Sequence, residues 1–432
     1  MSLKLGSVGQ HQDLVEPSVK SALIGRETNT ELATLLVSGI FPPKTGGSGR
    51  WFWEIYSRLP RQNFLIAAGE DPRQEEFDRS HDLRVVRLPL ELHSRAVRSL
   101  SGLRGYWRGV RALRSVLKAQ RVGMLHCGRC LPEGLMGLAL KWWYGVPYAC
   151  YAHGEELGTA STSRELTWLT RRVLRSASFV IANSQNTQRI LHEEWDVPDA
   201  SIRLLHPGAD TERFLPARRS LQVRTRLGWD NRPVVLTVGR LQKRKGHDQM
   251  IRAMIRICQS VPDALYAIIG DGEERSHLDA LVRESGLGDH VHFLGEVCDD
   301  QLIECYQQCD LFVLPNRAVG KDIEGFGMVL VEAQACGKPV IAGASGGTAE
   351  TMLISQTGRI VNCNGPDELA QIIPEWLRNR SLMEQMGRAA RDWVVERFDW
   401  SVLSKQASEQ LSEFSMAAPK AKCERVAIAT AE

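Results

Sequence analysis

The chain has 432 residues, a length that predicts two domains because one hydrophobic core seldom serves more than about 250–300 residues. Its hydrophobic content of 43% and its charged content of 24% are ordinary for a soluble globular protein. A net charge of +3 gives no bulk attraction to nucleic acid, and no apolar run reaches the ~18 residues that span a bilayer.

The two ends of the chain are expected to lie outside any domain. Residues 1–30 are polar and show no clear periodicity, which predicts a loose N-terminal extension. Asp13 and Glu16 lie in this stretch and it holds no hydrophobic segment, so we expect no secretory signal. Residues 416–432 mix Ala, Lys, Pro and Glu, which predicts a disordered tail. The expected location is the cytoplasm.

Residues 31–206 alternate short apolar strands with helical patterns, which predicts parallel βαβ units and a first Rossmann-like domain. The expected strands are 33–38, 63–67, 84–87, 124–126, 148–152 and 179–182. Ligands of such folds bind at the carboxyl ends of the strands. Gly46 and Gly47 follow the first strand and fit either a turn over a bound phosphate group or an ordinary strand-to-helix loop.

The segment 95–121 is strongly basic and has no acidic residue. Its basic residues are Arg95, Arg98, Arg104, Arg108, Arg111, Arg114, Lys118 and Arg121. A second set recurs at helical spacing and is expected to form a separate apolar face: Leu103, Trp107, Val110, Leu113 and Leu117.

A basic amphipathic helix that carries a Trp predicts contact with an anionic membrane surface. Trp142-Trp143-Tyr144 and the group Arg171, Arg172 and Arg175 favour the same interpretation. The alternative is a solvated helix whose apolar face packs on the core of the domain. Nucleic acid is not expected, because no aromatic-rich binding motif accompanies the charge.

Ten cysteines are scattered along the chain rather than arranged as a disulfide framework. Cys127 and Cys130 form a Cys-x-x-Cys pair after an expected strand, so a metal or redox role is one interpretation. No second Cys or His pair follows at zinc-like spacing, and Cys305 and Cys309 fall within an expected helix. Free thiols in a reducing cytoplasm are the preferred interpretation.

His153 follows the expected strand 148–152 and precedes Gly154 and Glu155. It should therefore lie at the carboxyl end of a strand, where ligands bind. A lone His in such a place is alternatively a hydrogen-bonded structural residue. The next segment is rich in turn residues, which predicts an interdomain linker over 207–216.

Residues 217–397 repeat the alternation and predict a second Rossmann-like domain. Its expected strands are 234–238, 266–269, 292–294, 311–314, 339–342 and 358–361. The predicted fold class is α/β, with two parallel-sheet domains that face each other across a cleft. Arg240 and Lys245 follow the first of these strands, where they are either surface charges or cations for a phosphate group.

The segment from Glu324 to Glu332 carries the most specific pattern. A buried strand precedes it, and an amphipathic helix of roughly nine residues is expected to begin within it. Gly325 and Gly327 would let a phosphate approach the free N–H groups and the positive end of that helix. Glu324 in the turn can meet a sugar, while Glu332 about two turns along can accept hydrogen bonds from a ribose. The pattern predicts a bound nucleotide sugar.

These residues resemble the Glu-x7-Glu signature of the retaining GT-B glycosyltransferases of family 4. Further segments resemble motifs of the same family, and the resemblance spans roughly residues 34 to 400. They are Phe41-Pro42-Pro43 with Gly46-Gly47, Tyr151-Ala152-His153-Gly154-Glu155, Ala182-Asn183-Ser184-Gln185, Val238-Gly239-Arg240-Leu241 with Lys245-Gly246-His247-Asp248, Ile269-Gly270-Asp271-Gly272-Glu273 and Phe293-Leu294-Gly295-Glu296-Val297. The resemblance implies that a C-terminal helix over 398–415 crosses back to the first domain.

The resemblance also implies roles for single residues. His153 would contact the donor sugar near the reacting carbon, and Glu324, Arg240 and Lys245 complete the expected catalytic set. The expected donor-binding set is Gly46, Gly47, Arg240, Lys245, Val297, Gly325, Phe326, Gly327, Met328, Val329 and Glu332. The sequence holds no Asp-x-Asp pair, so Arg240 and Lys245 are expected to stabilise the leaving diphosphate with no metal and no other cofactor.

The leading hypothesis is a retaining, metal-independent glycosyltransferase that extends a lipid-linked or polysaccharide glycan by a front-face reaction. The run Asp322-Ile323-Glu324-Gly325 resembles some mannosyltransferases and favours GDP-mannose over a UDP-sugar. A nucleotide-sugar epimerase of the same fold and a non-catalytic nucleotide-sugar binding protein are the alternatives. If the basic segment binds lipid, the protein is peripheral on the inner face of the cytoplasmic membrane.

Overall fold

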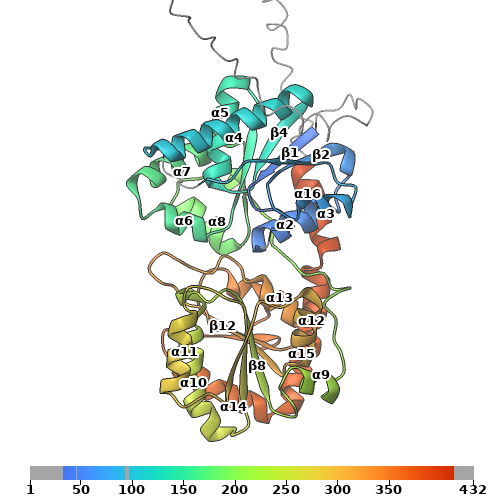
Figure 1. The fold of residues 1–432 in the computed structure, drawn as a ribbon, viewed down its shortest axis with the longest axis vertical. Helices are drawn as coiled ribbons and strands as arrows, with labels where there is room; N and C mark the ends of the chain where they lie inside the picture. The colour runs from blue at the N-terminus through green and yellow to red at the C-terminus, as the bar shows by residue number, and fades with distance from the viewer. Residues whose placement is uncertain (1–32, 45, 93–96, 413–432) are drawn as a thin grey trace, which may run out of the picture.

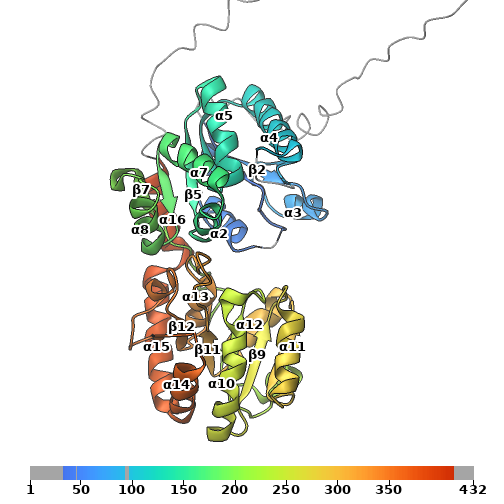
Figure 2. The same ribbon diagram turned by 90° about the vertical axis from the view of Figure 1, so that its left-hand side faces the viewer.

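The computed structural model describes residues 33–44, 46–92 and 97–412. The expected N-terminal extension over 1–30 and the expected tail over 416–432 lie outside these residues. Figure 1 shows two lobes, each built on a sheet with helices on both faces. The view turned by 90° in Figure 2 shows the same two lobes.

The N-terminal domain contains a seven-stranded parallel sheet in the order β3-β2-β1-β4-β5-β6-β7. Its strands are β1 Ala33–Ser38, β2 Phe64–Gly69, β3 Val85–Leu88, β4 Val122–Cys127, β5 Tyr148–Ala152, β6 Val180–Ala182 and β7 Ile202–Leu204. The six expected strands are confirmed within two residues at each end. Strand β7 was not predicted, because this edge strand has three residues, only one of them buried.

Helices on both faces of this sheet supply the rest of the core. They are α2 Gly47–Tyr56, α3 Gln74–Arg79, α4 Leu100–Ala119, α5 Leu135–Tyr144, α6 Glu155–Ala160, α7 Arg164–Ser176 and α8 Gln185–Glu193. Short 3-10 turns occupy η1 Arg61–Asn63 and η3 Asp199–Ser201, and a π turn occupies η2 Cys130–Gly134.

The C-terminal domain contains a six-stranded parallel sheet in the order β10-β9-β8-β11-β12-β13. Its strands are β8 Val234–Val238, β9 Leu265–Ile269, β10 Val291–Gly295, β11 Leu311–Leu314, β12 Val340–Gly343 and β13 Gly358–Val361. All six expected strands are confirmed within one residue at each end. Four of them, β8, β9, β11 and β12, are buried along their whole length, because both faces of the sheet are covered.

The helices of this domain flank its sheet on both sides (Figure 1). They are α9 Leu221–Arg226, α10 His247–Ser260, α11 Arg275–Glu284, α12 Asp299–Gln308, α13 Met328–Ala335, α14 Asp367–Arg378 and α15 Arg380–Arg397, with the 3-10 turns η4 Lys243–Lys245 and η5 Thr348–Thr351.

The chain crosses between the domains twice, and the two crossings lie side by side. The backbone N–H of Ala209 donates to the carbonyl of Phe398 over 2.9 Å. The Thr211 hydroxyl donates to Asp399 over 2.6 Å. The second crossing leads into α16 (Trp400–Ser412), which Figure 1 shows in the lobe of the N-terminal strands. Trp400 and Leu403 of this helix belong to the same buried cluster as Leu36 of β1.

Helix α4 is confirmed, but its predicted apolar face is wrong in part. The side chains of Leu103 and Trp107 are 55% and 60% exposed, whereas Val110 and Leu113 are buried. The buried face runs through glycines, because a Cβ atom at Gly105 would lie 2.3 Å from Leu92. Close packing along glycines turns the two large apolar residues outward, beside the arginines.

The packing of α16 gives a stability test. Trp400 is 1% exposed, so Trp400→Ala should remove buried contacts and destabilise the protein by about 3–5 kcal/mol. The exposed Lys405 on the same helix is the matched control, and Lys405→Ala should change stability by less than about 0.5 kcal/mol. Urea unfolding followed by circular dichroism measures both. Equal small effects of the two substitutions would show that α16 does not pack on the N-terminal domain.

Candidate active site

Each sheet has a topological switch point, and the carboxyl ends of the strands at that point lie near the region where the domains meet. The strand order reverses between β1 and β4 in one sheet and between β8 and β11 in the other. Doubly wound sheets bind ligands outside the carboxyl ends of the strands at such points. Gly46 and Gly47 follow β1, Arg240 and Lys245 follow β8, and Glu324 follows β11. The sequence-predicted residues therefore cluster where this fold binds ligands.

Two helix N-termini, those of α2 and α13, lie close together across the domain interface. A Cβ atom at Gly47, the first residue of α2, would lie 3.7 Å from the methyl group of Met328, the first residue of α13. Neither first turn has a side-chain cap or an acidic residue. The left-handed φ of 95° at Gly327 permits the sharp entry into α13. Free N–H groups and two positive helix ends thus favour an anion between the domains.

Glu324 lies in a buried cluster of opposite charges. Its Oε2 accepts hydrogen bonds from Lys245 Nζ and from Arg244 Nη1, both over 2.6 Å. Burial opposes the charge of the carboxylate, but the two cations outweigh it and lower the pKa of Glu324. Within the described part of the chain, no residue donates a hydrogen bond to Oε1. The carboxylate is therefore fixed by one oxygen and can receive a sugar hydroxyl with the other.

Arg244 links the two domains at this cluster. Besides Glu324, it pairs with Glu155 of the N-terminal domain over 2.9 Å and with Asp322 over 3.3 Å. Burial opposes the guanidinium charge, but these three carboxylates raise the pKa of Arg244. The sequence analysis missed Arg244. The basic run Lys243-Arg244-Lys245 marks the position, but only Lys245 matches the predicted phosphate-binding pattern.

Arg240 and Lys245 both follow β8 but differ in their surroundings. The Lys245 side chain is buried and runs back along the turn, since a Cβ atom at Gly239 would lie 3.6 Å from Lys245 Cε. The Arg240 side chain is exposed and has no hydrogen bond or ion pair to any residue that the structure describes. An Arg fork and a Lys point charge thus lie at the carboxyl end of β8, where they can bind phosphate oxygens.

His153 is held in one orientation at the end of β5. Its Nε2 atom lies 2.8 Å from the Gly128 carbonyl, which can only accept, so Nε2 is the protonated nitrogen. Trp51 and Phe52 pack edge-on against the ring at 5.5 and 5.9 Å between ring centroids. The imidazole therefore keeps Nδ1 for a further partner. The backbone carbonyl of His153 packs against Gly325. A Cβ atom at Gly325 would lie 2.1 Å from that carbonyl oxygen.

The remaining predicted donor residues surround the start of α13. Glu332 is buried and accepts from Tyr306 over 2.8 Å and from Arg50 of the N-terminal domain over 3.0 Å. Phe326 is buried, with its ring 5.4 Å from that of His206. Three others are half-buried and pack on the core of the C-terminal domain: Val297, Met328 and Val329. These apolar residues support the turn, whereas Glu332 offers a polar contact.

The cysteine pair lies in the core of the N-terminal domain. Cys127 and Cys130 are buried free thiols, and burial raises the pKa of Cys130 well above its ordinary value. Among the residues that the structure describes, no three His, Cys, Asp or Glu side chains gather as a metal site.

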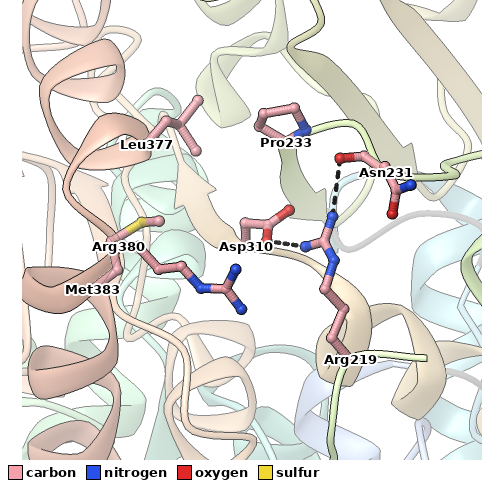
Figure 3. A pocket seen from close by; sticks show the side chains of 7 residues that line it. All are labelled: Arg219, Asn231, Pro233, Asp310, Leu377, Arg380 and Met383. Atoms are coloured by element: carbon pink, nitrogen blue, oxygen red, sulfur yellow. Dashed lines mark hydrogen bonds and ion pairs between the residues drawn. The ribbon is translucent and has the colours of Figure 1, made fainter. Parts of the chain in front are cut away.

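A pocket of about 310 Å³ lies away from these residues (Figure 3). Its lining includes Pro233 and Asp310, which precede β8 and β11. Figure 3 shows Arg219 paired with Asp310 at this pocket. The pocket therefore opens at the amino ends of the strands, opposite the domain interface.

Comparison with known proteins identifies the family. Residues 222–393 match the family Glycosyl transferases group 1, and residues 45–213 match Glycosyltransferase Family 4. A GDP-mannose-dependent alpha-(1-6)-phosphatidylinositol monomannoside mannosyltransferase from Mycobacterium tuberculosis is 32% identical, with 87% of this chain and 97% of that protein covered. The chain belongs to the group 1, family 4 glycosyltransferases. It is thus an enzyme of glycosyl transfer.

Solved structures confirm the predicted GT-B fold of this glycosyltransferase. Anabaena HepE in complex with UDP-glucose superposes with a TM-score of 0.75 at 23% identity, covering 88% of this chain and 99% of that one. Sucrose-phosphate synthase from Thermosynechococcus elongatus gives a TM-score of 0.75 at 23% identity, covering 89% and 100%. At this identity the likeness shows the fold alone.

The lowered pKa of Glu324 gives a test by pH. A carboxylate whose pKa is lowered on folding stabilises the protein above its ordinary pKa of 4.5, and this contribution disappears as the pH falls through the folded-state pKa. Glu324→Gln leaves the buried Lys245 without its carboxylate and removes one of the three carboxylates around Arg244, so it should destabilise the protein by about 3–5 kcal/mol near neutral pH. Urea unfolding should show this difference shrinking below pH 4.5. A difference that stays constant on acidification would contradict the ion pairs.

Proposed function

We propose that this glycosyltransferase moves a mannosyl residue from GDP-mannose to a lipid-linked glycan with retention of the anomeric configuration. The observation that carries the proposal is the set of groups at the domain interface. Two uncapped helix ends and the Arg240–Lys245 pair suit a diphosphate, while Glu324 Oε1 and His153 Nδ1 can contact the sugar beside it. The mannosyltransferase relative uses GDP-mannose and a phosphatidylinositol glycan, which supports both the donor and the acceptor class.

Transfer develops negative charge on the departing diphosphate and positive charge on the anomeric carbon. Arg240 and Lys245 stabilise the former as fixed cations. In a front-face reaction the acceptor attacks from the side that the nucleotide leaves, and the leaving phosphate oxygen takes the proton of the acceptor hydroxyl. No side chain then needs to act as a general base. Glu324 fixes the sugar and stabilises the positive charge beside it.

The donor assignment is tested with purified enzyme treated with a chelator. We expect GDP-mannose to be the preferred donor, turnover to survive the chelator, and nuclear magnetic resonance of the product to show an α-mannoside. Arg240→Ala should lower turnover by about a hundredfold, comparable to removing one oxyanion donor. The exposed neighbour Lys243 is the control, and Lys243→Ala should leave turnover nearly unchanged.

A β-mannoside would contradict retention. Activity that is lost with the chelator and restored by magnesium would contradict the role of the fixed cations. Near-normal turnover of the Arg240→Ala variant would remove that residue from the mechanism.

We also propose that the N-terminal domain docks on an anionic membrane surface. Leu100, Leu103 and Trp107 are exposed on α4 together with Arg104, Arg108 and Arg111. Exposed aromatic residues continue this surface on α5 and α7: Trp142, Trp143, Tyr144 and Trp168. Apolar and basic side chains on one exposed surface match an interfacial helix.

Contacts between the basic and aromatic side chains tie the three helices together. Arg111 lies over Trp107 at 5.4 Å, Arg114 of α4 over Tyr144 of α5 at 5.6 Å, and Arg172 of α7 over Trp142 of α5 at 5.5 Å. Figures 1 and 2 both show α4 and α5 on the side of the N-terminal lobe remote from the C-terminal domain. In the described ranges, no helix is both long and apolar enough to cross a bilayer.

Vesicle sedimentation tests the membrane surface. Each basic residue near an anionic surface contributes about 1 kcal/mol, so changing Arg104, Arg108 and Arg111 together to Gln should weaken binding by about a hundredfold. The matched control replaces three exposed arginines of the C-terminal domain, Arg252, Arg283 and Arg388, and should bind as the wild type does. Equal binding of both triple variants, or equal binding to neutral vesicles, would contradict the proposal.

A further inference from the structure

Arg50 reaches from the N-terminal domain into the donor side of the interface. It lies on α2, and its Nη1 atom donates to Glu332 Oε1 on α13 over 3.0 Å. The other oxygen of Glu332 accepts from the Tyr306 hydroxyl over 2.8 Å. The Arg50 guanidinium lies over the ring of Phe214 at 5.2 Å, which fixes its position. Glu332 is therefore held by one donor from each domain.

These two hydrogen bonds leave acceptor capacity on Glu332. An ionised carboxylate can accept about four hydrogen bonds, two at each oxygen. Arg50 and Tyr306 use one position on each oxygen, so one position on each stays available for a pair of hydroxyl groups. Two neighbouring ribose hydroxyls present such a pair of donors.

The positive charge of Arg50 compensates the negative charge of the buried Glu332 carboxylate. Glu332 is 3% exposed, and a buried carboxylate without a cation is strongly disfavoured. Among the described residues, Arg50 makes the ion pair of Glu332. Burial opposes the charge of Arg50, but Glu332 and Glu54 raise the pKa of the guanidinium. Tyr306 supplies a hydrogen bond but no charge.

We propose that Arg50 is the positioning residue for ribose recognition: its ion pair holds the Glu332 carboxylate in an orientation in which both oxygens can accept the ribose hydroxyls. The inference rests on the proposed function, in which Glu332 meets the ribose of the donor. Because Arg50 belongs to the N-terminal domain, recognition of the ribose depends on the two domains being in contact.

Isothermal titration calorimetry with GDP and 2′-deoxy-GDP tests the inference. The wild type should prefer GDP by about tenfold or more, because a hydrogen bond to a charged group is lost with the 2′-hydroxyl. Arg50→Ala should reduce this preference to near one, and Glu332→Gln should do the same. Adding Arg50→Ala to Glu332→Gln should not change the preference further. Arg50→Lys, which keeps the charge, should retain part of it.

Arg58→Ala is the matched control, since Arg58 also pairs with Glu54 and with an interdomain segment at Asp210. It should keep the wild-type preference for GDP. If Arg50→Ala weakens GDP and 2′-deoxy-GDP equally, Arg50 is only a structural link and the inference is overturned. If the wild type binds neither nucleotide, the proposed function fails and takes the inference with it. Thermal unfolding of each variant checks that the fold is intact.

Discussion

The buried pairing of Glu324 with Lys245 and Arg244 is the interaction on which the interface depends. Three charged groups lie out of water at the point where the carboxyl ends of two sheets meet. Burial of each charge is costly unless an opposite charge lies beside it. The loops that carry these residues are therefore fixed relative to one another. Arg244 extends this cluster to Glu155 and so ties the N-terminal domain to the donor side.

The same constraint prepares the site for a charged substrate. Charged side chains that are already fixed do not have to move when the diphosphate departs. Such preorganised groups lower the activation barrier of the transfer. Glu324 is held by Lys245 and Arg244, and Arg240 adds a cation whose side chain has no hydrogen bond or ion pair among the described residues. The exposed basic and aromatic surface lies on the other side of the N-terminal lobe (Figure 1).

Sequence patterns predicted the strands well and the contacts between domains poorly. Long apolar runs such as Val234–Val238 report burial on both faces of a sheet, and that signal is local. The predicted grouping of Leu103 and Trp107 on one face with Val110 was wrong, because the packed face of α4 is defined by glycines that carry no hydrophobic signal. Arg244 and Arg50 were missed for another reason. Their partners Glu155 and Glu332 are distant in sequence, so only the folded chain brings them together.

We expect the fixed cations at the domain interface to recognise the diphosphate of the donor. Calorimetry in chelator-treated buffer, comparing GDP with GMP, tests it most directly. The account predicts that the wild type binds GDP at least about tenfold more tightly than GMP, because a charge-assisted contact to the second phosphate adds roughly 1.5–3 kcal/mol. The Lys245→Ala and Arg240→Ala variants should lose most of this difference. Equal affinity for the two nucleotides, or a preference that needs added magnesium, would contradict the account.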